Sequence, residues 1–288
     1  MATITEPRTL EPAARPSFGH ASPLRVVRVI WLRELLAYSR DRARLVSSLT
    51  MPLLMIVIFG EGFGRSVDTF EEGINYRQFI YPGVVAMTVL TTSVFAGITI
   101  IWDREFGFLR EMLVAPISRS AIGVGKLLGG ASISVVQASL LFILAPLLGV
   151  NLSPLVIVQL WVLMLILALA MSAVGIVIAS KVRTVESFQM ITQMTIMPAM
   201  FLSGIFFPVN NVPVFLEVLA KINPVTYAVA PIRRVALGDQ LTTVSGEDTV
   251  VDVTLFGHVL STPESLAIVI AFGAVMLAIA IRSFQARS

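Results

Sequence analysis

Long runs of residues without charge divide this chain into alternating apolar and polar segments. A helix that crosses a bilayer needs about 20 predominantly apolar residues. The longest uncharged run, 127–180, exceeds one helix and contains Asn151, Ser153 and Pro154, residues typical of a turn. The pattern therefore predicts six spans, at about 45–63, 79–102, 127–149, 155–179, 187–207 and 265–281.

The residues before the first span predict a tail and a surface helix. Residues 1–22 are rich in Pro, Ala, Thr and Arg without an apolar run, so we expect a disordered cytoplasmic tail. In 23–44, helical spacing places Leu24, Val27, Trp31, Leu35 and Tyr38 on one face, with arginines opposite. This pattern predicts an amphipathic helix lying in the membrane interface, although a simple membrane anchor explains it equally well.

The segment 208–264, between the fifth and sixth spans, has a different pattern. Two apolar pieces, 212–222 and 225–237, are separated by Asn223-Pro224, and each is too short to cross a bilayer. We therefore expect re-entrant or interfacial helices there, because exposed irregular backbone is excluded from lipid. Residues 238–262 predict an exposed, hairpin-like loop, and 283–288 a short cytoplasmic tail.

Composition supports a membrane protein and excludes several classes. The 288 residues are 56% apolar and 14% charged, with a mean hydropathy of +0.86. A soluble domain has about 25% charged residues, so a soluble globular enzyme is excluded, and the high hydrophobicity excludes disorder. The chain has no cysteine and two distant histidines, which excludes disulfides and Cys-ligated metals and argues against a metal site.

Charge asymmetry predicts the orientation. Sixteen of the 21 Lys and Arg residues fall in the tails and loops that are cytoplasmic if the N-terminus is inside, and five fall in the other loops. Because cytoplasmic loops are enriched in Lys and Arg, we expect both termini inside. This distribution also explains the basic pI without nucleic acid.

The spans contain no ionisable residue deep inside them, which argues against an ion-driven carrier or an intramembrane enzyme. Gly125-Lys126 is followed by Leu127, not the Ser or Thr of a phosphate-binding loop, so ATP must be hydrolysed by another chain. We interpret Gly123, Gly125, Gly129 and Gly130 as sites of close helix packing.

The segment 103–116 alternates charges with large apolar residues. Phe106, Leu109, Met112 and Leu113 recur at helical spacing, and Pro116 ends the pattern. A helix that docks a protein fits better than one resting on lipid, because carboxylates gain nothing from an anionic membrane surface. An ordinary interfacial turn is the alternative.

Three stretches together resemble a known family. Residues 103–119 with 126–129, the stretch 201–209 (Phe-Leu-Ser-Gly-Ile-Phe-Phe-Pro-Val) and the stretch 223–228 with 231–233 resemble the motifs of ABC-2 type transporter permeases. The similarity is greatest to the daunorubicin-resistance-like multidrug exporter branch and extends from about residue 24 to the C-terminus. Ala230 departs from the pattern, since that position is often Asp in the family.

The resemblance implies an all-α, six-span fold of the type V exporter kind, with a cytoplasmic coupling helix. Such a permease forms a dimer, with itself or a homologous permease, in the inner (plasma) membrane. Two separate ATPase subunits, which hold the ATP and Mg²⁺, dock on it, and it exports amphipathic drugs or lipids. No cofactor, metal or catalytic residue is implied in this chain. The coupling residues would be Asp103, Arg104, Glu105, Phe106, Gly107, Leu109, Arg110 and Glu111.

Two further sets of residues are candidates for contact with cargo. Uncharged polar and soft apolar residues on the second and fifth spans predict a substrate path, namely Thr88, Thr91, Thr92, Phe95, Thr99, Gln189, Thr192, Gln193, Met197 and Phe201. Helix packing explains the same residues. The resemblance also implies an outer gate at Phe206, Phe207, Pro208, Asn223, Pro224 and Tyr227. Two other functions stay open: export of a polysaccharide or other polymer, and a membrane scaffold or regulator without transport.

Overall fold

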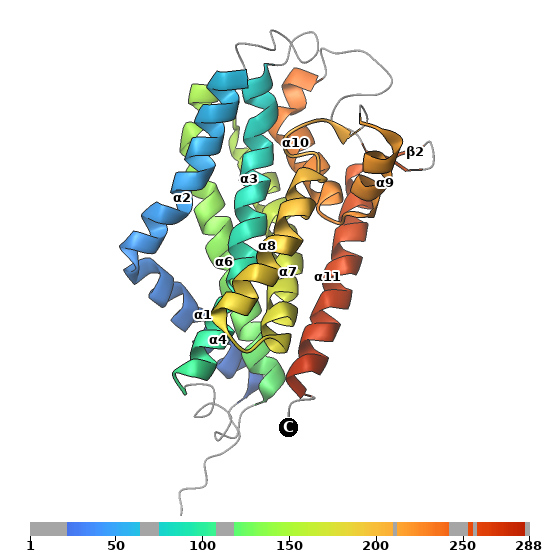
Figure 1. The fold of residues 1–288 in the computed structure, drawn as a ribbon. Helices are drawn as coiled ribbons and strands as arrows, with labels where there is room; N and C mark the ends of the chain where they lie inside the picture. The colour runs from blue at the N-terminus through green and yellow to red at the C-terminus, as the bar shows by residue number, and fades with distance from the viewer. Residues whose placement is uncertain are drawn as a thin grey trace, which may run out of the picture.

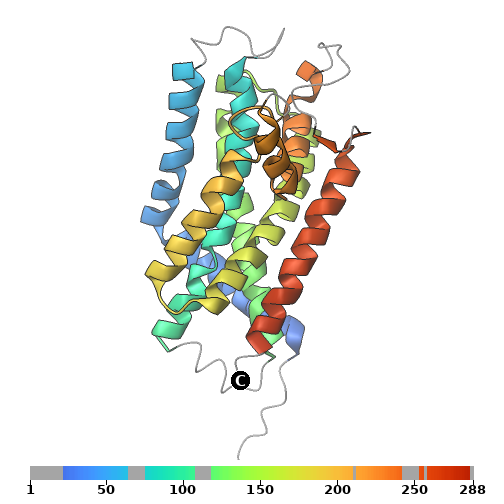
Figure 2. The same cartoon turned by 45° about the vertical axis from the view of Figure 1, so that its right-hand side comes forward.

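The computed structural model describes residues 22–63, 75–107, 118–209, 212–241, 253–255 and 258–285. These residues form an elongated bundle of helices, with the N-terminal helix across its lower end (Figures 1 and 2). The only strands in the described part are β1 (Thr254–Leu255) and β2 (His258–Val259), which pair antiparallel within the predicted hairpin-like loop.

The long helices follow the predicted spans in order. They are α2 (Arg42–Val57) with the π-helical η1 (Ile58–Phe63), α3 (Tyr76–Phe95) continued by α4 (Ile98–Glu105), α6 (Arg119–Leu140), α7 (Pro154–Lys181), α8 (Val185–Phe201) and α11 (Thr262–Gln285). Four described segments are long and apolar enough to cross a membrane: Tyr76–Glu105, Ser120–Leu144, Pro154–Lys181 and Thr262–Ser283. A bent pair, Pro23–Arg40 with Leu45–Gly60, would make a fifth. The second, third, fourth and sixth predicted spans therefore correspond to span-capable helices, while the count of six stays a prediction.

Two helices end earlier than the sequence pattern suggested. After α6 the chain continues in 3₁₀ turns, η2 (Leu141–Leu144) and η3 (Pro146–Leu148), because Pro146 has no amide hydrogen for a continuing α-helix. The α8 helix ends at Phe201, not near residue 207, and Gly204 has a positive φ of 80° that an α-helix cannot contain. The expected turn at 149–154 is present, and the Ser153 hydroxyl caps α7 by accepting from the Val156 amide.

The N-terminal helix α1 spans Pro23–Arg40, and the chain bends by 74° before the next apolar helix. The expected helix over 23–44 is therefore interrupted at Asp41. Of the predicted apolar stripe, Leu24 is 83% exposed and Tyr38 is buried; its position in the membrane interface stays a prediction. The buried face consists of Val26, Ile30, Glu34 and Tyr38, which recur every four residues and face α6. The sequence interpretation did not identify this second face, because it contains a buried glutamate, Glu34.

Glycines on α6 allow α1 to approach closely. A Cβ atom added at Gly129 would lie 2.8 Å from the Glu34 Cβ, and one added at Gly125 would lie 2.8 Å from the Ile30 Cβ. This spacing of two small residues four positions apart is the geometry by which helices approach each other in membranes. The predicted role in close helix packing is confirmed for Gly125 and Gly129.

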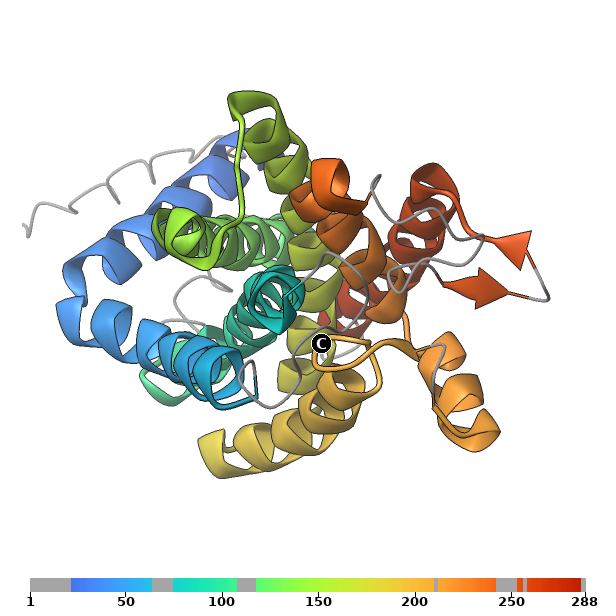
Figure 3. The ribbon, with the colours of Figure 1, turned by 90° about the horizontal axis from the view of Figure 1, so that it is seen from above.

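The helix α3 lies in the middle of the bundle (Figure 3), and residues 79–90 are all buried. Polar contacts connect its neighbours. The side-chain amide of Gln137 on α6 accepts hydrogen bonds from the hydroxyls of Tyr38 (3.0 Å) and Thr92 (3.0 Å), and donates to the Ser48 carbonyl (3.1 Å). One amide therefore connects α1, α2, α3 and α6.

Two helices occupy the 212–241 region at the upper end of the bundle (Figure 1), as the sequence predicted for its two apolar pieces. The nine-residue α9 (Val214–Ile222) has an exposed apolar face, with Val214 75% and Phe215 66% exposed. The following helix, α10 (Thr226–Leu241), is largely buried against the bundle. Their expected re-entrant or interfacial position stays a prediction.

The close packing of α1 on α6 predicts that Gly129→Ala destabilises the protein. The added methyl group would overlap Glu34, and overpacking of this kind costs about 1–3 kcal/mol. Reversible unfolding in mixed micelles measures the loss. Gly238→Ala is the matched control, because nothing lies within 4 Å of a Cβ added there. Equal stability of the Gly129 variant and wild type would show that α1 does not pack on α6 at this distance.

Candidate functional site

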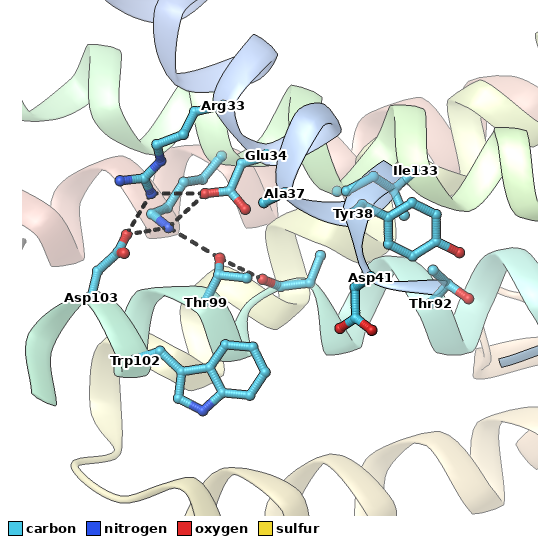
Figure 4. Close-up of a pocket in the computed structure, with 13 residues that line it drawn as sticks. Arg33, Glu34, Ala37, Tyr38, Asp41, Thr92, Thr99, Trp102, Asp103 and Ile133 are labelled. Atoms are coloured by element: carbon cyan, nitrogen blue, oxygen red, sulfur yellow. Dashed lines mark hydrogen bonds and ion pairs between the residues drawn. The ribbon is translucent and has the colours of Figure 1, made fainter. Parts of the chain in front are cut away.

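Four charged side chains from three helices form an ion network at the lower end of the bundle (Figure 4). The Lys126 ammonium on α6 lies 3.1 Å from Glu34 Oε1 on α1 and 2.6 Å from Asp103 Oδ2 on α4. The Arg33 guanidinium on α1 contacts the same two oxygens, at 3.0 Å and 2.9 Å. The network therefore attaches the N-terminal helix to the end of α4 and to the start of α6.

Burial makes this network a strong constraint. The Lys126 side chain is 2% exposed, and those of Glu34 and Asp103 are 10% and 13% exposed. Removing one partner from a buried ion pair is costly, because the remaining charge stays desolvated without compensation. Arg33 is 39% exposed and closes the network toward the surface.

A cavity of about 400 Å³ borders the ion network. In Figure 4, Arg33, Glu34 and Asp103 gather at one end of it, and Tyr38 and Ile133 lie at the other. Its lining comes from α1, α3, α4, α6 and the break after α1, namely Arg33, Glu34, Ala37, Tyr38, Asp41, Thr92, Ala96, Thr99, Trp102, Asp103, Lys126, Gly130 and Ile133.

The predicted coupling residues separate into an anchored pair and an exposed pair. Asp103 belongs to the ion network, and Arg104 donates to the backbone carbonyls of Val182 (2.8 Å) and Ala179 (3.4 Å) at the end of α7. Glu105 is exposed, and Phe106 is 74% exposed. The C-terminal end of α4 thus exposes the Glu105 carboxylate and the Phe106 ring. The two residues before them, Asp103 and Arg104, are held in place by contacts with neighbouring helices.

The predicted coupling helix does not begin as a separate element. Residues 103–105 are the last residues of α4, and Gly107, with a φ of 83°, follows its C-terminus. A left-handed glycine commonly ends a helix, which explains why no continuous helix runs through this position. Leu109, Arg110 and Glu111 lie outside the described residues.

On α3 and α4, the predicted substrate-path residues make contacts within the chain. Thr88 and Thr91 donate to the carbonyls four residues before them (2.8 Å each), and Thr92 donates to Gln137. Thr99 donates to the Ala96 carbonyl and accepts from Lys126, while the Phe95 ring packs edge-on against Phe188 with ring centres 6.2 Å apart. These contacts correspond to the helix-packing interpretation of the same residues.

On α8 the predicted path residues lie mainly at the surface. Thr192 is buried, whereas Gln189, Gln193, Met197 and Phe201 are exposed. Met190 (67% exposed) and Met194 (73% exposed) extend the same exposed side of the helix. The structure therefore places the α3 set inside the bundle and most of the α8 set outside it. A path shared by both sets stays a prediction.

The predicted outer-gate residues lie together at the upper end of the bundle. The Phe206 ring packs against Phe201, with ring centres 5.1 Å apart, and the Asn223 amide donates to the Ala199 carbonyl at 2.6 Å. The Tyr227 hydroxyl donates to the Lys221 carbonyl, and burial raises the pKa of this phenol, which keeps it a neutral donor. Of the other members, Pro208 is buried, and Phe207 and Pro224 are half-buried.

Arg233 belongs to the stretch 231–233 that carries the resemblance, but it was not among the predicted outer-gate residues. Its guanidinium donates to the carbonyls of Gly204 (2.7 Å) and Ile205 (3.2 Å) and lies 3.8 Å from the centre of the Phe79 ring. It therefore fixes the chain after α8 against α3. The sequence signal for its role was an arginine within the apolar segment 225–237. Such an arginine is either exposed at the surface or buried with a polar partner.

Arg33, Glu34 and Lys126 were also missed as partners of Asp103. The sequence shows Glu34 as the lone acid of a basic helix and Lys126 as the last charge before a long apolar run. Both features indicate a charge at a membrane boundary, but they do not identify its partner, which is 92 residues away in the chain.

Comparison with known proteins agrees with the resemblance in the sequence. Residues 25–237 match the family model described as ABC-2 type transporter. The chain is 29% identical over 211 residues to the putative transport permease ycf38 of Cyanophora paradoxa, covering 71% of this chain and 72% of that protein. It is 26% identical over 215 residues to the inner membrane transport permease YadH of Escherichia coli K12 (73% and 82% covered). It is also 26% identical over 218 residues to nodulation protein J of Rhizobium leguminosarum bv. viciae (75% and 83% covered).

The ion network predicts that Lys126→Met strongly destabilises the protein. The variant leaves the carboxylates of Glu34 and Asp103 buried with Arg33 as their remaining cation, and breaking a buried pair costs about 3–5 kcal/mol. Unfolding in mixed micelles measures the loss. Lys181→Met is the matched control, since Lys181 is exposed at the end of α7 and we expect it to change stability little. Similar stability of the two variants would contradict the buried network.

Proposed function

Since the chain belongs to the ABC-2 type transporter family, we propose that it is the membrane subunit of an ATP-binding-cassette exporter for amphipathic drugs or lipids. Its family consists of transport permeases that are not themselves catalytic, and the chain is a multi-pass protein of the cell membrane. A separate ATPase subunit, which binds ATP and Mg²⁺, would supply the energy. The working unit would contain two permeases, either two copies of this chain or this chain with a homologue.

The exposed end of α4 is the observation that most directly supports coupling to an ATPase. Phe106 is 74% exposed, and it follows Asp103, which is held by ion pairs to α1 and α6, and Arg104, which is held by hydrogen bonds to the end of α7. An exposed aromatic side chain on a rigid base is typical of a residue that anchors a protein partner. Glu105 would pair with a basic residue of the ATPase. Leu109, Arg110 and Glu111 are proposed to extend the same contact.

The mechanism we propose is alternating access driven from this contact. ATP binding would close the paired ATPase subunits and displace the end of α4, and the ion network would transmit the displacement to α1 and α6. A partner shifts a conformational equilibrium only through different contacts with the two states. The exposed Glu105 and Phe106, and the network behind them, are where such differences would arise.

The proposed cargo follows from the chemistry of the predicted path. The path residues on α3 and α8 are uncharged, and the exposed methionines of α8 present a soft apolar surface. Such a wall favours amphipathic molecules over free polyanions. The buried cluster around Phe206 and Arg233 is proposed to close the outer end of the path until transport.

The coupling role predicts the effect of Phe106→Ala on ATP hydrolysis. Loss of an interface anchor costs about 1–4 kcal/mol, which corresponds to about a 5- to 1000-fold weaker contact. In nanodiscs with the co-purified ATPase, we expect amphipathic drugs or lipids to stimulate ATP turnover by wild type and not by Phe106→Ala. Glu105→Ala should show a smaller loss. Purified oligosaccharides, tested in parallel, address the polymer alternative.

Phe215→Ala is the matched control for this experiment, because Phe215 is similarly exposed (66%) but lies on α9 at the opposite end of the bundle. It should couple as wild type does. If Phe106→Ala also couples as wild type, the end of α4 is not the docking contact. If no ATPase co-purifies with wild type, the scaffold interpretation replaces that of an exporter.

A further inference from the structure

We propose that the outward face of α1, the side of the helix that turns away from α6, binds anionic phospholipids of the bilayer surface. The sequence pattern predicts only that this helix lies in the membrane interface, and the new inference concerns which face meets the lipid and which head group it selects. It goes beyond the proposed function, because it can be measured without cargo and without an ATPase. The helix lies at the lower end of the bundle (Figures 1 and 2), where we expect the cytoplasmic surface.

One side of α1 is committed to packing inside the protein. Val26, Ile30, Glu34 and Tyr38 are buried and face α6. Because they recur every four residues, they form one side of the helix, and the opposite side turns away from the bundle. The chain bends by 74° between α1 and the next apolar helix. If that helix crosses the bilayer, α1 lies close to the membrane plane.

The outward face of α1 carries positive charge that no acid balances. Arg25, Arg28 and Arg40 are exposed there, and none of them forms an ion pair with a residue that the structure describes. The one acidic residue of α1, Glu34, is on the buried side. The next acid, Asp41, follows the end of the helix and lines the cavity beside the ion network. The outward face therefore presents three guanidinium groups and no carboxylate.

Large apolar side chains lie between these arginines. Leu24 is 83% exposed, Val29 60%, Leu32 39% and Leu36 55%. A helix face of this kind favours the membrane interface, into which an amphipathic helix sinks by about 5–10 Å. The aliphatic part of an arginine can lie along such apolar surface while its guanidinium reaches the level of the lipid phosphates. Water alone would leave all four apolar side chains without a partner.

The unbalanced charge selects the head group. Each arginine near an anionic membrane surface adds about 1 kcal/mol of attraction, which corresponds to about fivefold in binding. A zwitterionic head group gives much less, because its own ammonium offsets its phosphate. We therefore expect phosphatidylglycerol to be enriched over phosphatidylcholine along α1.

The test is a fluorescent label placed on the outward face. The chain has no cysteine, so one introduced cysteine accepts a single label. Ser39 is exposed among the arginines, and Ser39→Cys would carry a bimane group. The full chain is placed in nanodiscs of phosphatidylcholine and phosphatidylglycerol, in which one lipid or the other has a brominated acyl chain that quenches the label. The ratio of the two quenching efficiencies at equal lipid content reports the local enrichment.

We expect an enrichment of phosphatidylglycerol of about fivefold or more at Ser39→Cys. The matched control is Leu165→Cys, because Leu165 is 42% exposed on the apolar helix α7 and far from the arginines of α1 in the chain. Its label should be quenched equally by the two lipids. Raising the salt concentration from about 0.1 to about 0.5 M should lower the enrichment at Ser39→Cys, because ions screen exposed charges.

Neutral variants assign the enrichment to the arginines. The combined change Arg25→Gln, Arg28→Gln and Arg40→Gln keeps polar side chains and should bring the ratio at Ser39→Cys to within about twofold of equality. Arg282→Gln removes an exposed charge at the lower end of α11 and should leave that ratio unchanged. Melting temperatures equal to that of the labelled parent confirm that both variants are folded.

Equal quenching of Ser39→Cys by the two lipids would overturn the proposal, because the face would then have no preference for charge. Enrichment that persists in the folded triple variant would overturn it as well, because the arginines would not be its cause. If neither lipid quenches Ser39→Cys while both quench Leu165→Cys, a protein surface covers the outward face, and the proposal of a lipid site is wrong.

Discussion

The contact of one buried lysine with two carboxylates determines how the lower part of this molecule is arranged. Lys126 stands at the start of a long apolar segment, and it is 2% exposed beside Glu34 and Asp103. Because an ammonium in this position is costly without partners, α1 and α4 must both be in place for α6 to keep its position. Gly125 and Gly129 make this possible by allowing the backbone of α1 to approach α6. The cavity, the exposed end of α4 and the packing of α1 all follow from this arrangement.

Much of the fold could be predicted from local pattern. Charge-free runs located the long helices, Asn151, Ser153 and Pro154 located a turn, and the glycines of α6 indicated close packing, because each depends on residues near one another in the chain. The face of α1 could not be predicted. Its buried side includes Glu34, and a glutamate is assigned to the surface unless its partner is known. That partner is far away in sequence, and only the folded chain brings the two together.

The candidate site shows the same division. Exposure of Glu105 and Phe106 agrees with the docking role predicted for them, while Asp103 and Arg104 from the same stretch point inward. The sequence pattern could not distinguish the inward pair from the exposed pair, since all four residues are consecutive and each is charged or aromatic. The threonines of α3 illustrate a related limit. A threonine in a helix can donate to its own backbone or to a guest, and the sequence is identical in both cases.

The contact of Arg104 with the end of α7 has a mechanical consequence. Its guanidinium binds the carbonyls of Ala179 and Val182, and only three residues separate α7 from α8. A load applied at the end of α4 is therefore divided between the ion network on one side and the α7–α8 corner on the other. If the proposed coupling rotates α8 about this corner, a small rotation would become a larger sideways displacement at the far end of this 17-residue helix. The amplitude of that displacement would then depend on the length of α8 rather than on the strength of any single bond.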